Sequence, residues 1–235
     1  MGVAPVLLII TIIMRLPLLL ACSLATTSFF AANPTATAAD AGGISGSAIV
    51  REMNLARQNP ALYATYLEEM RGQFNGNMLV RPGRIPFRTK EGVKAVEEAI
   101  RYLRSASPRA PLVFSPGMSR GAADHCAAQA RGGMSHNAGG NTASRISRYG
   151  IWSGSWGENI SCGRQSAREI VIALIIDDGL RSRKHRDNIF STNFSYAGAA
   201  VGPHAQYRTV CSMSFAGGYV EGVRGDTAAA LFARN

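Results

Sequence analysis

Apolar positions recur every three or four residues in the first part of the chain, a spacing that predicts helices. They indicate one helix over Ser47 to Asn59 and a second that begins at Pro60, with Asn59 as its cap. The apolar stripes are Ile49, Met53 and Ala56 in the first helix and Tyr63, Tyr66, Leu67 and Met70 in the second. The segment from Arg71 to Arg88 is interrupted by glycines and prolines, so we expect a long loop there.

Two more helices are predicted before the middle of the chain. Thr89 is a suitable cap for the first of them. Its apolar stripe is Val93, Val96, Ile100 and Leu103. Ser115 followed by Pro116 is typical of a helix start, and the alanine-rich helix that follows should run from Gly117 to Arg131. The segment from Ser135 to Trp156 is polar and contains glycines, and we expect a loop.

Strands are predicted mainly in the last third of the chain. Glu158 to Cys162 reads as a short strand, Ala167 to Ile176 as a strongly apolar helix, and Arg181 to Asn188 as a charged loop. Tyr196 to Val201 and Thr209 to Phe215 read as the two strands of an antiparallel hairpin. Helices come first and strands then surround one further helix, which predicts an α+β fold with a sheet covered by helices.

The first residues are typical of an export signal. Residues Val6 to Leu20 are largely apolar, and translation from either Met1 or Met14 would place an apolar core before the small residues Ala36-Thr37-Ala38. We therefore expect a signal peptide over residues 1–39, a linker over 40–46 and a secreted or periplasmic protein. Lipid anchoring at Cys22 is an alternative, although Leu20 fits a lipoprotein processing site poorly.

The charge adds a weaker indication of partners. The chain has 235 residues, a length that fits one domain plus a leader, and a net charge of +10 that comes almost entirely from arginine. The arginines are scattered rather than clustered, and no basic strip with interleaved aromatic residues is present, so we do not expect nucleic-acid binding. An anionic envelope surface is the partner that net charge alone would favour. We expect a monomer.

Three cysteines follow the leader. Cys162 and Cys211 lie in predicted strands whereas Cys126 lies in a predicted helix, which favours a Cys162–Cys211 disulfide in an exported protein. The alternative of three buried thiols stays open, because connectivity cannot be deduced from sequence alone.

Four short segments in order resemble the CAP superfamily, which includes the cysteine-rich secretory, antigen 5 and pathogenesis-related 1 proteins and is also called the SCP domain. They are Asn54-Leu55-Ala56-Arg57, Ser135-His136-Asn137, Gly157-Glu158-Asn159-Ile160 and Lys184-His185-Arg186-Asp187-Asn188-Ile189-Phe190. The chain is most similar to exported bacterial members, which have few cysteines. The resemblance implies a three-layer α-β-α sandwich around a central antiparallel sheet over residues 47–220, followed by a C-terminal tail over 221–235.

The same resemblance implies a metal site. His136, Glu158 and His185 match the family positions that meet in a cleft, and two imidazoles with one carboxylate suit Zn²⁺ or another divalent cation. Many members carry a second glutamate on the following helix, for which Glu169, Asp177 and Asp178 are imperfect matches. We expect both aspartates to pair with the arginine-rich loop after that helix.

Other candidate residues have a structural interpretation beside the functional one. His125 lies within an alanine-rich helix and is expected to be structural. Trp152, Trp156 and His204 are candidates for the rim of a ligand site, although the tryptophans would equally suit packing over the sheet edge and His204 lies in a predicted turn.

The resemblance favours a binding module without turnover, whose cleft holds a divalent cation and a small lipid-like ligand or an envelope polymer. One alternative is a metal-assisted hydrolase of the peptidase kind, in which His136, Glu158 and His185 would activate water. Another is an envelope protein that acts through surface charge alone.

Overall fold

Helices and strands alternate along residues 44–222, the part of the chain that the structure, a computed structural model, describes. The predicted signal peptide with Cys22, most of the predicted linker and nearly all of the predicted tail lie outside these residues. No helix within the described part is long and apolar enough to cross a membrane. The helices are α1 (Gly46–Gln58), α2 (Pro60–Arg71), α3 (Val93–Ser105), α4 (Pro116–Gln129), α5 (Thr142–Ile146), α6 (Ala167–Ile176) and α7 (Lys184–Phe190).

The strands form two sheets. The strands are β1 (Phe74–Asn75), β2 (Met78–Leu79), β3 (Phe87–Arg88), β4 (Val113–Phe114), β5 (Gly150–Cys162), β6 (Tyr196–His204) and β7 (Arg208–Glu221). The larger sheet has the order β4-β6-β7-β5. Its long strands β5, β6 and β7 are antiparallel, as predicted, and the short β4 adds a parallel edge beside β6. β1, β2 and β3 form a separate small antiparallel sheet.

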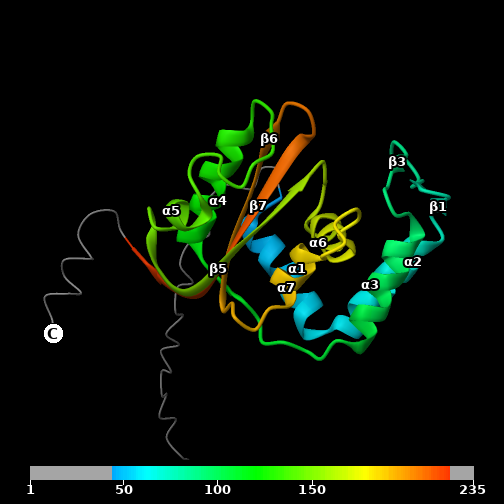
Figure 1. Cartoon of the computed structure of the whole chain (residues 1–235), viewed down its shortest axis with the longest axis horizontal. Coiled ribbons are helices and arrows are strands. Elements are labelled where there is room, and N and C mark those ends of the chain that lie inside the picture. The colour runs from blue at the N-terminus through cyan, green and yellow to red at the C-terminus, as the bar shows by residue number, and fades with distance from the viewer. Residues whose placement is uncertain (1–43, 223–235) are drawn as a thin grey trace, which may run out of the picture. The chain divides into compact units, whose positions relative to one another are not determined.

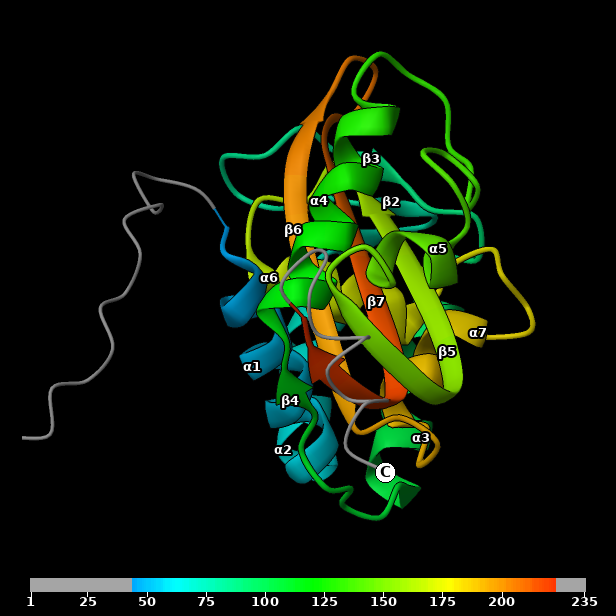
Figure 2. The same cartoon turned by 90° about the vertical axis from the view of Figure 1, so that its left-hand side faces the viewer.

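The larger sheet is the middle of three layers. Helices α4 and α5 cover one face, while α1, α6 and α7 lie on the other face with α2 and α3 outside them (Figure 1). The view along the perpendicular direction shows α4 and α5 in front of β6, β7 and β5 (Figure 2). The predicted α-β-α sandwich is therefore confirmed.

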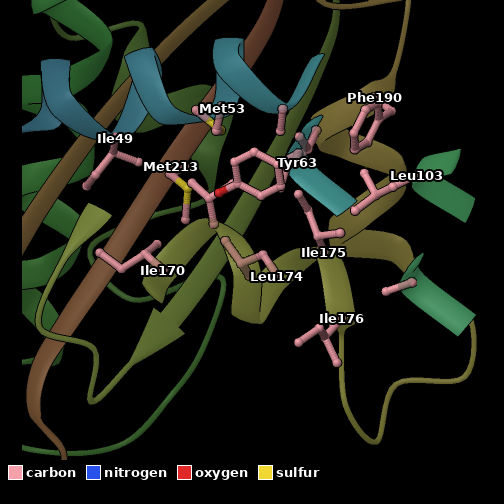
Figure 3. Close-up of a cluster of buried hydrophobic side chains, with 14 of the residues drawn as sticks. Ile49, Met53, Tyr63, Leu103, Ile170, Leu174, Ile175, Ile176, Phe190 and Met213 are labelled. Atoms are coloured by element: carbon pink, nitrogen blue, oxygen red, sulfur yellow. The ribbon is translucent and has the colours of Figure 1, made fainter. Parts of the chain in front are cut away.

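The main hydrophobic core fills the space between the sheet and the helices of the larger layer. It joins Met53 from α1, Tyr63 from α2, Leu174 from α6 and Met213 from β7, all almost fully buried (Figure 3). Burial of such side chains is worth about 1.5–3 kcal/mol each, so this layer contributes much of the stability of the fold.

The segment predicted as a long loop is partly ordered by pairing. Phe74 pairs with Leu79 in β1 and β2, and Gly76, at a φ of 58°, makes the turn between them. Thr89 does not cap α3 as predicted. Its hydroxyl donates to the carbonyl of Asn77, and the helix begins only after Gly92, which has a φ of 65°.

Three other boundaries differ from the predictions. The predicted polar loop contains α5, whose cap is Asn141, and the start of the long strand β5. The predicted charged loop contains α7. In both cases tertiary contacts stabilise elements whose own sequence has weak periodicity.

The predicted Cys162–Cys211 disulfide is not present, and the cysteines among the described residues are free thiols. Cys162 pairs with Val210 across β5 and β7, so its side chain shares a face with Val210, while the next residue, Cys211, points to the other face. Burial raises the pKa of the Cys126 thiol to about 11 and holds the pKa of the Cys211 thiol well above its ordinary value. The prediction failed because Cys162 and Cys211 lie on neighbouring strands but on opposite faces.

Candidate functional site

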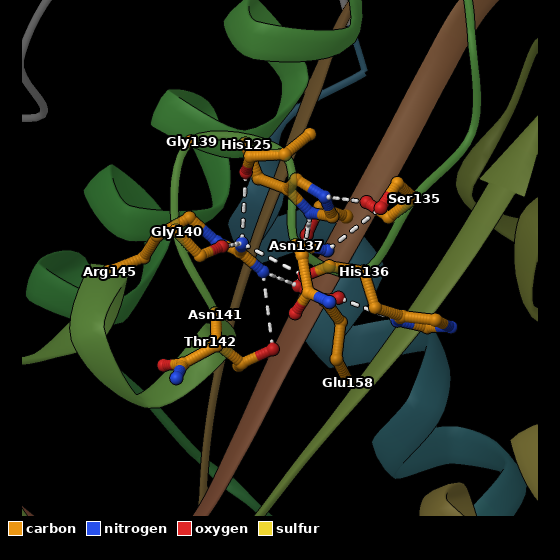
Figure 4. Close-up of polar contacts among 12 residues, drawn as sticks. His125, Ser135, His136, Asn137, Gly139, Gly140, Asn141, Thr142, Arg145 and Glu158 are labelled. Carbon is orange, nitrogen blue, oxygen red and sulfur yellow. Dashed lines mark hydrogen bonds and ion pairs between the residues drawn. The ribbon is translucent and has the colours of Figure 1, made fainter.

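Glu158 lies at the centre of a buried polar cluster on the face of the sheet that α4 and α5 cover (Figure 4). His136 Nδ1 lies 2.7 Å from its Oε2, and His125 Nδ1 lies 3.0 Å from its Oε1. The Oε1 atom also accepts a hydrogen bond from a guanidinium nitrogen of Arg145 and a longer one, at 3.3 Å, from the Ser212 hydroxyl. Among the described residues Oε1 therefore has three partners, whereas Oε2 has His136 alone.

Arg145 holds the loop before it as well as the carboxylate. Its side chain is fully buried, and its Nη1 donates to the carbonyls of His136, Ala138 and Gly140. Its Nη2 donates to Thr142 Oγ1 at 3.2 Å as well as to Glu158. One guanidinium thus fixes the loop that carries His136 to the strand that carries Glu158.

The pKa of Glu158 reflects two opposing effects. Burial alone would raise it, but the bonds to His125 and His136 and the charge of Arg145 outweigh burial and hold the pKa below its ordinary value. Glu158 is therefore an ionised carboxylate at neutral pH. His136 donates its Nδ1 proton to it, because a carboxylate can only accept, and its Nε2 atom takes no part in this bond.

His185 has a different carboxylate partner. It lies in the first turn of α7, where its Nδ1 is 2.8 Å from Asp177 Oδ1 and its backbone N–H donates to Asp177 Oδ2. The carbonyl of His185 accepts a hydrogen bond from the side chain of Asn159. Asn159 follows Glu158 in β5, so the Asn159 side chain lies on the opposite face of the strand from that of Glu158. The chain thus brings His136 and Glu158 together but attaches His185 to a second carboxylate.

The structure holds the three predicted metal ligands in two separate pairs, His136 with Glu158 and His185 with Asp177, and the metal site itself stays a prediction. Among residues 44–222, no three His, Cys, Asp or Glu side chains gather around a common point. Glu158 holds His136 through Oε2, whereas His185 is held by Asp177, and we derive no step through a metal. Each histidine does have Nδ1 bonded to a carboxylate, an arrangement common behind histidine ligands of metals. Zinc binding through their Nε2 atoms stays a prediction.

The acidic residues after the Glu158 strand have partners other than those expected. The side chain of Asp177 is bonded to His185 rather than to an arginine, and it is the Asp177 carbonyl that accepts a hydrogen bond from Arg183. Asp178 accepts the backbone N–H groups of Lys90 and Glu91, at the start of α3. The arginines of the loop pair instead with glutamates from or just before α3.

The other histidines are structural. His125 is fully buried, with Nδ1 at 3.0 Å from Ser212 Oγ and Nε2 at 2.8 Å from the Ser135 carbonyl, in line with the expectation. His204 is buried rather than exposed. Its Nε2 bonds the Gly133 carbonyl and its Nδ1 accepts backbone N–H groups of the following turn.

Residues that pattern reasoning missed complete the cluster. Arg145 lies in a segment predicted as a loop, and no spacing identifies it as the partner of Glu158. Ser212 could have been predicted from the strand pattern. Alternation along β7 places it on the same face as Ser214, which pairs with Glu158.

A separate cavity of about 470 Å³ lies on the opposite side of the sheet layer. Residues from α2, the β1–β3 sheet, the end of β5 and α6 line it. Its apolar wall includes Phe74, Leu79, Phe87, Ile172 and Leu174. Asp177 and His185 contribute a polar part of the wall, but His136 and Glu158 do not line it.

The residues expected at a ligand rim do not line this cavity either. Trp152 packs over the sheet and donates its indole N–H to Ser147 Oγ at 3.1 Å. Trp156 is 44% exposed on β5. Neither tryptophan, nor His204, is among the lining residues.

The remaining motif residues form hydrogen bonds between segments that are distant in the sequence. Asn54 bonds both the N–H and the carbonyl of Leu112, and Arg57 donates to the carbonyls of Ala110, Ile189 and Ser191. Asn188 bonds the Asn159 side chain and the Glu158 carbonyl. The four motifs thus meet in space through side-chain to backbone bonds.

Comparison with known proteins agrees with this arrangement. The model of the cysteine-rich secretory protein family, CAP, matches residues 97–215, about half of the chain, and the chain belongs to that family. The match covers α4, the Glu158 cluster, α6 and α7. No curated protein and no solved structure gives a significant match.

Proposed function

We propose that this CAP domain is a binding module, without turnover, for a small and largely apolar ligand. The observation that carries the proposal is the cavity of about 470 Å³, which lies within the roughly 300–1,000 Å³ typical of small-molecule sites. Apolar side chains such as Phe74, Leu79 and Ile172 form one part of its wall, and polar or charged residues form the other part. Such a wall suits a ligand with an apolar body that polar contacts orient.

The enclosing elements favour a small ligand over a polymer. The cavity has walls from α2, α6, the β1–β3 sheet and β5, so a ligand is contacted from several sides. A polymer would need an open groove along the surface. The small ligand is therefore the version of the binding hypothesis that we adopt.

The hydrolase alternative receives less support. A general base needs a free lone pair within reach of a water molecule. Arg145 and His125 hold Oε1 of Glu158, His136 is hydrogen-bonded to Oε2, and Glu158 is not among the residues that line the cavity. The geometry of Glu158 suits a structural anchor better than a base.

Zinc binding remains part of the proposal only through the two histidines. A zinc titration followed by calorimetry, on the wild type and on His136→Ala, tests it. We expect the variant to bind zinc more weakly. Equal zinc affinity in both proteins would exclude His136 as a ligand.

The ligand proposal is tested with a neutral fluorescent probe, N-phenyl-1-naphthylamine. We expect saturable binding at one site per chain and loss of binding in Ile172→Trp, since the indole would fill the cavity. The matched control is Leu62→Trp, because Leu62 lies on the exposed side of α2, which also contributes to the wall, and is 47% exposed. Probe binding unaffected by Ile172→Trp, with the variant folded, would contradict the proposal.

A further inference from the structure

The hairpin that joins β2 to β3 exposes apolar side chains that the rest of the described chain leaves largely uncovered. Ile85, next to its turn, is 89% exposed, and Val80 and Phe87 on either side of it are almost half exposed. Ile85 and Val80 belong to none of the hydrophobic clusters formed by residues 44–222. A single exposed apolar residue is ordinary, but three close together on one short hairpin indicate an interaction site.

The turn of this hairpin has a defined shape. The N–H of Arg84 donates to the Arg81 carbonyl at 3.1 Å, and Gly83 between them has a φ of 67°, a conformation that favours glycine. A proline before Gly83 and another after Ile85 restrict the backbone further. The small sheet lies on the opposite side of the fold from α4 and α5 (Figure 1). The turn therefore holds Ile85 away from the core.

The same segment is strongly basic. Residues 71–90 contain four arginines and one lysine and no aspartate or glutamate. Arg81 and Arg84 share one carboxylate, that of Glu169, at 2.9 and 3.2 Å. Arg88 on β3 is exposed, and its guanidinium makes no hydrogen bond or ion pair among residues 44–222. The hairpin therefore has an excess of positive charge beside its exposed apolar side chains.

We propose that the β2–β3 hairpin docks on the surface of an anionic lipid bilayer, with Ile85 inserted between the lipids and the basic side chains at the phosphates. Apolar side chains beside cations match the two layers of such a surface, the acyl chains below and the negative headgroups above. This inference goes beyond the proposed function and does not rest on it, because Ile85 and Arg88 do not line the cavity.

The small size of the exposed surface favours a bilayer over a protein partner. It consists of residues 80–88, of which Arg81 alone is partly buried. Standard protein interfaces use about 20–30 residues on each side. A bilayer needs no complementary surface, since a few inserted apolar side chains and several cations act together on it. The hairpin has both in one short segment.

Sedimentation with lipid vesicles tests the proposal, with every variant isolated as the cell produces it so that all have the same N-terminus. The vesicles are phosphatidylcholine alone and phosphatidylcholine with about one third phosphatidylglycerol. We expect at least about tenfold tighter binding to the anionic vesicles, and weaker binding at high salt. Ile85→Ser should weaken this binding about tenfold, because the inserted apolar side chain is lost, whereas Ile85→Leu should retain it. Arg88→Gln should weaken it about fivefold, the effect of one cation.

Two variants outside the hairpin are matched controls. Ile151→Ser removes an isoleucine that is 46% exposed on β5, and Arg131→Gln removes an exposed arginine just after α4. Both should bind anionic vesicles within about twofold of the wild type, because charges more than a Debye length from the bilayer are screened. Ile85→Ser should also keep the affinity for N-phenyl-1-naphthylamine, since Ile85 does not line the cavity. That measurement separates this inference from the proposed function.

Failure of the wild type to bind anionic vesicles, unchanged binding in Ile85→Ser, or an equal loss in Ile151→Ser would overturn the proposal. Binding of soluble polyglutamate that depends on Arg88 and not on Ile85 would assign the hairpin to an anionic polymer instead. Self-association of the wild type that Ile85→Ser abolishes, without vesicle binding, would assign it to a second copy of the chain.

Discussion

At the scale of single residues, Glu158 and Arg145 form the most tightly connected ion pair of the domain. Both side chains are almost fully buried, and each has several further bonds to side chains or carbonyls. Removal of one partner from such a pair is costly, because the other charge stays buried without compensation.

Arg145→Met should therefore destabilise the domain by about 3–5 kcal/mol. The variant leaves the Glu158 carboxylate short of a counter-charge and frees three loop carbonyls. Urea unfolding followed by circular dichroism measures the change. Arg148→Met is the matched control, because Arg148 lies just after α5 and its pair with Asp124 and its bond to the Gly139 carbonyl are both accessible to solvent, so its loss should cost only about 1 kcal/mol. Equal losses in the two variants would show that burial of the pair does not determine its contribution.

The candidate site was predictable only where a family motif marked a residue. The contact between His136 and Glu158 follows from the resemblance, although their separation in sequence gives no local signal. Arg145 carried no signal, because a single arginine in a polar segment resembles any solvated residue. The partner of His185 was missed because Asp177 was expected to pair with arginines.

At the scale of secondary structure, caps and apolar stripes identified the long helices. Ser115 caps α4 by accepting the N–H of Met118, and the stripe of α2 is buried at Tyr63 and Leu67. The short elements were missed. β1, β2 and β3 have two residues each, too few to show alternation, and α7 has seven residues with three charged side chains before Asn188. Such elements depend on contacts that only the folded chain supplies.

The hydrogen bonds of Arg57 test whether α1 stabilises the segments that it contacts. Arg57 lies in α1, and its guanidinium donates to Ala110, Ile189 and Ser191, which joins α1 to the end of α7 and to the segment before β4. Arg57→Lys keeps the charge but loses the fork of donors. We expect a loss of about 1.5–3 kcal/mol in the free energy of unfolding, the range for hydrogen bonds of charged groups.

The control for this variant is Arg51→Lys on the same helix. Arg51 is exposed and donates only to Ser47 Oγ, one turn earlier, at 3.2 Å. Its replacement should leave the urea midpoint nearly unchanged. If Arg57→Lys were equally neutral, the three carbonyl bonds would have no net effect on stability.

At the scale of the whole domain, the two outer layers separate two kinds of chemistry. The layer of α4 and α5 buries the ionic cluster around Glu158, whereas the opposite layer contains the apolar core and the cavity. The Glu158 cluster and the proposed ligand site share no residue, although the cavity reaches Ile160 and Cys162, which lie farther along the same strand as Glu158. Mutations in the anchor should affect stability, and mutations in the cavity should affect binding.

Acid should destabilise the domain through a group of paired glutamates. Hydrogen bonds from Arg183 lower the pKa of Glu91 to about 2, and bonds from Arg186 outweigh burial to lower that of Glu98. The pKa of Glu158 is lowered as well. A carboxyl group whose pKa is lower in the folded than in the unfolded chain stabilises the fold above its unfolded pKa, near 4.3 for glutamate. That contribution is lost as the pH falls through the folded pKa.

We therefore expect the free energy of unfolding to fall steadily from about pH 5 downward, with little change between about pH 5 and pH 7 from these groups. Urea unfolding at a series of pH values measures this slope, and Glu158→Gln should make it shallower because one linked proton is removed. High salt should weaken the contribution of the partly exposed pair of Glu91 with Arg183 more than the contribution of the buried Glu158. A slope that is the same in wild type and Glu158→Gln would mean that the pKa of Glu158 is the same in the folded and the unfolded chain, which contradicts the lowering expected from its contacts with His125, His136 and Arg145.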